Sequence, residues 1–306
     1  GEITGSPGVS VSTRGPGAAN MVNGVAHAWM DRAPLIVIND QYPGATYETG
    51  MRQVLNQHAL FAPITKWQST IHAKSVRQQI RRAIRVTTTP TPGPVQFDMP
   101  SNETMGEAVE AAGEAPLLPN VVPMEPDRNA LRVPLQALSS ASKPILLAGL
   151  GVFWDEASEE LVKLAERLGA PVLTTSKCKG AIPEDHPLRA GCIIGGIIER
   201  ELVMQADLIV TVGLDAIELQ PKPWPYAIPV ISLANTPTLE ALVPAQSEMI
   251  GNLKTMLAAL AAFAPEGSGW GESAAKSFRE QVTTALDVPT QGLSPQGAME
   301  VARAVL

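Results

Sequence analysis

Two apolar runs separated by a glycine-proline-glycine turn and a helical segment constrain the fold of this chain most. A β-rich run over residues 9–13 meets the turn at 15–17, and a second apolar run covers 34–38. Between them, apolar residues recur at helical spacing: Val22, Val25, Ala26 and Trp29. This order predicts a βαβ unit with parallel strands. Ligands of such sheets bind beyond the carboxyl ends of the strands, where the turn and Gln41 fall.

The residues of this turn determine which backbone conformations it can adopt. Gly15 and Gly17 permit backbone angles that a side chain forbids, and they let another molecule approach closely. Pro16 stiffens the turn. The helix that follows begins with free N–H groups and a partial positive charge. A tight turn without a ligand is the competing interpretation, and the turn taken alone favours it.

The composition excludes several classes of protein. The chain has 306 residues, 45% of them apolar and 17% charged, with a net charge of −7. This length is enough for two ordinary domains. We find neither the basic patch of a nucleic-acid-binding protein nor an apolar run that could cross a membrane. Cys178 and Cys192 are the only cysteines. So few cysteines fit a reducing, cytoplasmic location, which is therefore expected. The spacing of the two cysteines matches no metal or redox motif.

The first unit is expected to cover residues 1–104. Apolar residues at helical spacing predict a helix over 75–86, and a buried strand is predicted over 94–98. Residues 105–127 contain several prolines and few apolar runs, which indicates a linker.

The second unit is expected to cover residues 128–264. Short apolar strands alternate with helices in this region, at 144–148, 171–175, 207–212 and 229–233. Asp155 is predicted to cap the helix that Gly169 ends, and a further helix is predicted near 248–263. Strands that alternate with helices imply α/β architecture, with parallel sheets flanked by helices on both faces.

Several motifs together resemble one family. GPGAAN at 15–20, the strand APLIVI followed by Gln41, ITKW at 64–67 and GPVQFDMP at 93–100 occur in that order. In order and spacing they resemble the acetolactate synthase-like branch of the thiamine diphosphate enzymes, over essentially the whole chain. Those proteins have a pyrimidine-binding, a central and a diphosphate-binding domain.

The resemblance implies a particular domain arrangement. It implies an incomplete flavodoxin-like pyrimidine-binding domain over 1–104, followed by a Rossmann-like central domain over 128–264. Residues 265–306 are then a linker and the start of the diphosphate-binding domain. On this basis the chain is expected to begin inside the first domain and to lack both ends of the enzyme.

The same resemblance implies part of a carboligase or decarboxylase that acts on 2-keto acids with thiamine diphosphate and Mg²⁺. It assigns the cofactor contacts to Gly15, Pro16, Gly17, Asn20 and Gln41. In the family, the glutamate that activates the cofactor precedes the turn and the Mg²⁺ ligands follow in the third domain. The catalytic residues are therefore unknown here, and the chain alone is expected to be inactive. A homodimer or homotetramer is implied for the full protein.

The substrate-site candidates follow the first βαβ unit: Arg52, Gln53, Gln57 and Lys66. Acetolactate synthases have Phe-Gln-Glu where this chain has Arg52-Gln53-Val54, so only Gln53 matches. This departure favours another carboligase or decarboxylase of the same superfamily. Arg52 can hold a substrate carboxylate through paired hydrogen bonds, and a surface arginine is an equally good interpretation.

The central region contains two weaker motifs. Gly149-Leu150-Gly151 is a fragment of a dinucleotide-binding turn whose third glycine is absent, and a tight connection is the favoured interpretation. Residues 174–180 carry hydroxyls and two lysines that can hold a phosphate, and a solvated loop is an equally good interpretation. The arginine-rich stretch of FAD-binding relatives is missing at 213–219, so FAD is not expected. A non-catalytic ADP- or FAD-binding or interaction module stays open as the alternative, whereas an NAD-dependent dehydrogenase lacks its glycine fingerprint.

The four histidines are not clustered in the sequence: His27, His58, His72 and His186. No pair has metal-ligand spacing, so all are predicted to be structural or solvated, and no metal site is expected in the chain.

Overall fold

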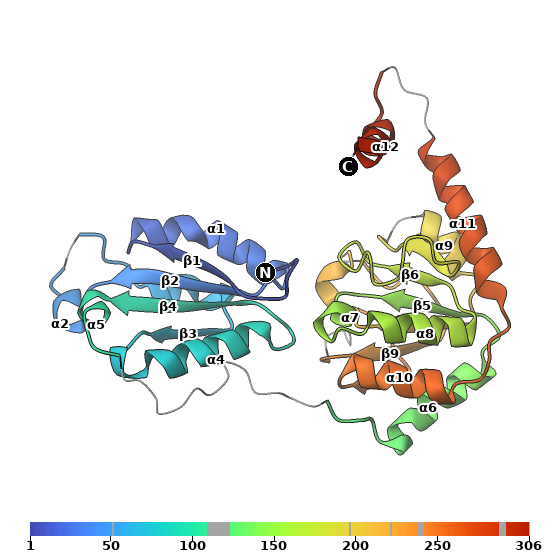
Figure 1. Ribbon diagram of the computed structural model, residues 1–306, viewed down its shortest axis with the longest axis horizontal. Helices are drawn as coiled ribbons and strands as arrows, with labels where there is room; N and C mark the ends of the chain where they lie inside the picture. The colour runs from blue at the N-terminus through green and yellow to red at the C-terminus, as the bar shows by residue number, and fades with distance from the viewer. Residues whose placement is uncertain are drawn as a thin grey trace. The chain divides into compact units, whose positions relative to one another are not determined.

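The chain divides into two compact units, residues 1–122 and 123–306 (Figure 1). The computed structural model describes residues 1–50, 52–108, 123–195, 197–220, 222–237, 242–287 and 292–305. Each unit is built on one sheet, and the strand pairs described are all parallel. The predicted α/β class is therefore confirmed. No helix in the described ranges is long and apolar enough to cross a membrane.

The first unit contains a four-stranded sheet in the order β1-β2-β4-β3. Its main elements are β1 (Gly8–Ser12), α1 (Pro16–Met30), β2 (Leu35–Gln41), α2 (Gly44–Tyr47), α3 (Gln57–Phe61), β3 (Trp67–Thr70), α4 (Val76–Thr88), β4 (Pro94–Pro100) and α5 (Ser101–Thr104). The predicted βαβ unit is thus present as β1, α1 and β2. The apolar runs in the sequence do not indicate β3, because its residues, Trp-Gln-Ser-Thr, are mostly polar.

Helices cover both faces of this sheet. On one face, Ala18 and Val25 of α1 pack with Val37 of β2 in a buried cluster. On the other face, Ala83 of α4 packs with Phe97 of β4. Because side chains alternate along a strand, β2 contributes Ile36 to one cluster and Val37 to the other. Helices α1 and α4 therefore cover opposite faces of the sheet (Figure 1).

The second unit contains a six-stranded sheet in the order β10-β9-β8-β5-β6-β7. Its main elements are α6 (Arg128–Ser140), β5 (Pro144–Ala148), α7 (Gly151–Trp154), α8 (Ser158–Leu168), β6 (Val172–Thr174), β7 (Arg189–Cys192), α9 (Ile198–Val203), β8 (Leu208–Val212), β9 (Val230–Ala234), β10 (Ser247–Ile250), α10 (Leu253–Phe263), α11 (Trp270–Leu286) and α12 (Pro295–Val305). The strands predicted at 144–148, 171–175, 207–212 and 229–233 are confirmed as β5, β6, β8 and β9.

The central strand β5 divides the core of this unit. All five of its residues are buried. Leu146 and Ala148 point into a cluster with α6, α8 and α10, whereas Ile145 and Leu147 point into a cluster with α9 and α11. This burial of both faces explains why β5 is continuously apolar instead of alternating.

The structure corrects two predictions on helix ends. Asp155 does not cap α8, because the N-cap residue of that helix is Ala157. The Asp155 Oδ2 instead accepts a hydrogen bond from the backbone N–H of Leu253 at 2.6 Å. The predicted helix near 248–263 begins only at Leu253, because Asn252 caps it. Residues 247–250 form β10, so Ile250 is an exposed strand residue and not part of the helix face.

Two further elements bear on the predicted boundaries. Gly169 ends α8 in the left-handed conformation, as predicted, with a φ of 54°. Helix α11 begins inside the segment that was expected to be a linker, and its buried Phe278 joins the core of the second unit. Helix α12 has no buried residue. The boundaries of the functional domains stay predictions.

Candidate functional site

The carboxyl ends of β1, β2 and β4 meet at one edge of the first sheet. The register places Ser12 beside Asn39, and Asn39 beside Asp98. Asn39 and Asp98 are both buried although they are polar. Buried polar side chains need hydrogen-bond partners, so this edge must contain an internal network.

The predicted glycine turn lies at this edge and begins α1. Gly15 has φ 61° and ψ −112°, a conformation open to glycine. A Cβ at Gly15 would lie 2.5 Å from the backbone oxygen of Gln53. Glycine is therefore required here both by the backbone angle and by the close approach of a neighbouring loop.

Gln57 connects the turn to the sheet. Its side chain is 1% exposed. Its Oε1 accepts the backbone N–H of Gly15 at 3.1 Å. Its Nε2 donates to the Asp98 Oδ1 at 2.7 Å and to the backbone oxygen of Asp40 at 3.2 Å. One amide thus ties the turn to both β2 and β4.

Asp98 is the centre of the network. Besides Gln57, its carboxylate accepts hydrogen bonds from the Nε2 atoms of Gln96 at 2.8 Å and Gln41 at 3.4 Å. The His58 Nε2 lies 3.5 Å from the Asp98 Oδ2, and no hydrogen-bond partner for that nitrogen occurs among the described residues. The carboxylate is therefore held mainly by neutral amide donors, which fix the ends of two strands.

An arginine that the sequence did not single out lies on the same edge. Arg14 forms an ion pair with Asp40 at 2.7 Å. Its guanidinium also lies 3.9 Å above the ring of Tyr42. The Tyr42 hydroxyl donates to the backbone oxygen of Arg52 at 3.1 Å. These contacts attach the loop that carries Arg52 and Gln53 to the end of β2.

The structure brings together most of the predicted site residues. Gly15, Gln41 and Gln57 share the network, and Gln53 contacts Gly15. The remaining candidates at this edge are more accessible: Pro16, Asn20 and Arg52 are exposed, and Gly17 is partly buried.

Lys66 is the candidate that is not brought to this edge. It directly precedes β3, and its backbone N–H donates to Pro94, the first residue of β4. It therefore lies at the amino ends of the strands. Its Nζ donates to the backbone oxygen of Thr89 at 2.7 Å. Burial, with a smaller contribution from the charge of Arg32, lowers the pKa of Lys66 to about 8.

Sequence reasoning missed Asn39, Gln96 and Asp98 as members of the site. Each interrupts an otherwise apolar strand, and that interruption was the available signal. A polar residue inside a buried strand needs a partner: α3 provides one for Asp98, and Gln96 donates to Asn39.

The histidines remain dispersed in space. Among the described residues, no group of three or more histidine, cysteine, aspartate or glutamate side chains could hold a metal ion. His27 pairs with Asp31 at 2.8 Å, His72 with Glu103 at 3.7 Å and His186 with Glu166 at 3.3 Å. 

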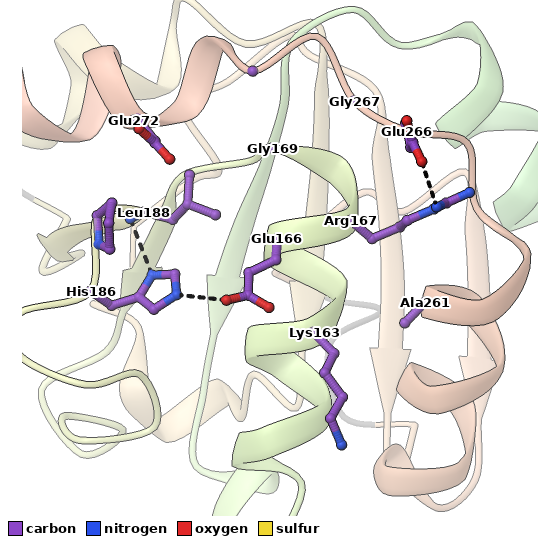
Figure 2. A pocket seen from close by; sticks show the side chains of 12 residues that line it. Lys163, Glu166, Arg167, Gly169, His186, Leu188, Ala261, Glu266, Gly267 and Glu272 are labelled. Carbon is purple, nitrogen blue, oxygen red and sulfur yellow. Dashed lines mark hydrogen bonds and ion pairs between the residues drawn. The ribbon is translucent and has the colours of Figure 1, made fainter.

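A cavity of about 730 Å³ in the second unit lies where α8 ends and α11 begins, away from the carboxyl edge of the sheet (Figure 2). Among its charged side chains, Arg167 pairs with Glu266 at 3.1 Å and His186 with Glu166 at 3.3 Å. Lys163 and Glu272 also line the cavity. We assign this cavity no role.

The turn Gly149-Leu150-Gly151 is filled by the chain itself. The Gly149 and Gly151 N–H groups donate to the backbone oxygens of Val212 and Gly213, both at 2.8 Å. The Leu150 N–H donates to the Glu218 carboxylate, at 2.9 and 3.0 Å to its two oxygens. The tight-connection interpretation of this turn thus accounts for the Gly149 and Gly151 donors, which both bind backbone oxygens.

Comparison with known families matches both units of the chain. Residues 1–60 match the N-terminal TPP binding domain of thiamine pyrophosphate enzymes, and residues 132–260 match their central domain. The chain belongs to the thiamine pyrophosphate enzyme family. The first match contains the Gly15 turn, Gln41 and Gln57, whereas Asp98 lies outside the matched residues.

Individual relatives agree with the family. A probable acetolactate synthase large subunit of Methanocaldococcus jannaschii is 35% identical over 219 residues, which is 69% of this chain and 37% of the relative. A probable 2-ketoarginine decarboxylase of Pseudomonas aeruginosa is 32% identical over 222 residues, or 70% of this chain and 38% of the relative. An acetolactate synthase large subunit of Mycobacterium tuberculosis is 30% identical over 215 residues, or 69% and 35%. The chain thus spans little more than a third of these enzymes, and none of them is named as a nucleotide-binding or interaction module.

Proposed function

We propose that residues 1–306 are the part of a thiamine diphosphate-dependent 2-keto acid carboligase or decarboxylase that forms the pyrimidine side of its cofactor site. The buried Gln57 network carries this proposal, because it fixes the glycine turn and the ends of β2 and β4 as one rigid edge. Rigid support of this kind is what a cofactor wall requires.

The residues at this edge fit a neutral, polar ring. Pro16 and Asn20 are exposed beside the turn, whereas Gly15 is buried against the backbone of Gln53. The nearby charge of Arg14 is compensated by Asp40. Amide and backbone groups therefore dominate the surface, and they suit a heterocycle better than a phosphate. When bound, thiamine diphosphate supplies the electron sink for cleavage or formation of the bond next to the keto group.

Each predicted residue except Lys66 receives a role in this proposal. Gly15, Pro16, Gly17 and Asn20 form the wall beside the pyrimidine. Gln41 and Gln57 hold that wall from behind through Asp98. Arg52, exposed on the adjoining loop, binds the carboxylate of the 2-keto acid, and Gln53 adds a polar contact.

The remaining groups come from outside this chain. The described residues contain no cluster that could hold a metal, so the Mg²⁺ ligands belong to another domain of the full protein. A homodimer or homotetramer in the cytoplasm completes the proposal, with the diphosphate domain contributed by a second copy.

The test is turnover of 2-keto acids by the protein that carries these residues, supplied with thiamine diphosphate and Mg²⁺. We expect cofactor-dependent release of carbon dioxide from at least one member of a panel that includes pyruvate and 2-ketoarginine. Product analysis then separates a ligated hydroxy-keto acid from an aldehyde. Absence of turnover across the panel, together with absence of cofactor binding, would exclude the proposal.

The proposed substrate contact has its own variant. Arg52→Met should raise KM for the keto acid at least tenfold while cofactor affinity is unchanged, since the loss concerns a charged hydrogen bond to substrate. Arg77→Met, at an exposed position of α4, is the matched control. Equal KM values for both variants would remove Arg52 from the substrate site.

A further inference from the structure

Three loops of the second unit meet around one carboxylate. They follow β5, β6 and β8, so they lie at the carboxyl edge of the sheet, where nucleotides bind in many parallel α/β domains. The carboxylate is that of Glu218, in the short 3₁₀ helix Ala216–Glu218 after β8. Its surroundings are buried: Thr175 and Asp215 are each 1% exposed.

Glu218 accepts hydrogen bonds from each of these loops. The Leu150 backbone N–H lies 3.0 Å from Oε1 and 2.9 Å from Oε2. The Asp215 N–H donates to Oε2 at 2.9 Å, and the Thr175 hydroxyl donates to Oε1. Two backbone amides and one hydroxyl that converge on an anion are the donor set of an oxyanion or phosphate site.

Helix capping explains only part of this arrangement. Glu218 and Asp215 form a local capping box, which requires just the contact with the Asp215 N–H. Leu150 and Thr175 are 68 and 43 residues away in sequence. Their donors therefore converge on Glu218 for a reason that the short helix does not supply.

The glycine turn is shaped around the carboxylate. A Cβ at Gly149 would lie 2.5 Å from the Glu218 Oε2. The glycine thus permits the close approach that in dinucleotide-binding turns serves a diphosphate. Burial raises the pKa of Glu218, and the hydrogen bonds from Thr175, Asp215 and Leu150 oppose that rise.

We propose that Leu150, Thr175 and Asp215 form an anion site which the chain fills with its own Glu218 carboxylate, so that nucleotide diphosphates are excluded from this turn. The ligand of the opened site is a small carboxylate or a phosphate group. This inference concerns the second unit alone and does not depend on the proposed function of the first.

The test opens the site by substitution. In Glu218→Ala, the Leu150 and Asp215 amides should exchange hydrogen at least tenfold faster than in the wild type, because they lose their acceptor. Sodium formate should slow this exchange and raise Tm, saturably, beyond sodium chloride of equal ionic strength. Adding Thr175→Val should weaken the formate effect, since one donor is lost.

Controls separate this site from general salt effects. Glu280→Ala, at an exposed position of α11, should show no formate response. Glu218→Gln keeps the site filled, so it should respond to formate no more than the wild type. ADP should leave Tm of the wild type unchanged at millimolar concentration.

Two results would overturn the proposal. One is saturable stabilisation of the wild type by ADP that Thr175→Val abolishes, which would mean that a nucleotide already binds here. The other is a Glu218→Ala protein that responds equally to formate and chloride. If Glu218→Ala does not fold in chloride, recovery of the fold in formate supports the anion site, and failure to recover contradicts it.

Discussion

Gln57 shows how one side chain can define a site. Its amide oxygen accepts the Gly15 N–H, and its amide nitrogen donates to Asp98. Because Gln57 is buried, water cannot replace these hydrogen bonds when they are lost. Gln57→Met should therefore lower the free energy of unfolding of the first unit by about 2–4 kcal/mol, because it orphans the buried Gly15 N–H and removes one of the hydrogen bonds to the Asp98 carboxylate. Urea denaturation measures this change. Gln78→Met, at an exposed position of α4, should stay within about 0.5 kcal/mol of the wild type.

Lys66 gives the first unit a pH dependence. Its folded-state pKa is lowered to about 8 from an ordinary value of 10.5. Between these two pH values the unfolded chain binds the proton and the folded chain does not, so stability rises as pH increases through this window. Below pH 8 both states are protonated and the unfavourable contribution is constant.

Lys66→Met should remove this rise. We expect the wild-type free energy of unfolding to increase relative to that of the variant between pH 8 and pH 10, measured by urea denaturation at each pH. Identical pH profiles for the two proteins would contradict the assigned burial of the ammonium group.

A candidate residue can be predicted from sequence when its signal lies within a few neighbouring residues. The Gly15 turn and Gln41 have such signals, because a glycine turn and the end of a strand are visible in a short stretch of sequence. Asp98 was not found, because its role arises only when β4 pairs with β2 and α3 places Gln57 against it. Lys66 was grouped with the site by sequence proximity, although strand direction carries it to the opposite edge.

At the scale of elements, local end signals were reliable where one residue decides the conformation. Gly169 ends α8 because its φ of 54° suits glycine. Asp155 was assigned to the nearest helix in sequence, whereas it binds the start of α10, 98 residues away. The apolar spacing over 248–263 indicates a helix throughout. The first residues of this range instead belong to β10, which pairs with β9 in parallel.

Gly169→Ala tests the end of α8. The left-handed φ and the approach of a new Cβ to within 2.9 Å of the Gly269 N should together cost about 1–2 kcal/mol. Thermal unfolding measures the effect. Gly251→Ala has only a Met256 sulfur at 3.8 Å near its Cβ position, and it should be nearly neutral. Equal loss in both variants would show that the cap conformation contributes nothing specific.

At the scale of the whole molecule, the described cores belong to separate units. The clusters around β1–β4 contain no residue of the second unit, and the clusters around β5–β10 contain none of the first. Each sheet is built from one contiguous stretch of the chain, and the domain bounds expected from the sequence stay predictions. The place of α11 in the second core is not visible in the sequence, since the residues that lead into it, 264–273, have the glycine-rich composition of a linker.

Leu147→Ala tests the independence of the two cores. Leu147 is fully buried in the second unit, so its truncation should cost about 2–5 kcal/mol there. Hydrogen exchange at Phe97, in the first core, should stay unchanged. Faster exchange at Phe97 would mean that the units unfold together.

The most direct measurement for the central claim is the affinity of the protein that carries residues 1–306 for thiamine diphosphate in the presence of Mg²⁺. Calorimetric titration should give a Kd at least tenfold weaker for Gly15→Ala, because its Cβ would meet the Gln53 oxygen and displace the turn. Gly24→Ala, at an exposed position of α1 with open space around it, should bind as the wild type does. Equal affinities for Gly15→Ala and Gly24→Ala, or no binding by the wild type, would contradict the assignment of this turn to the cofactor site.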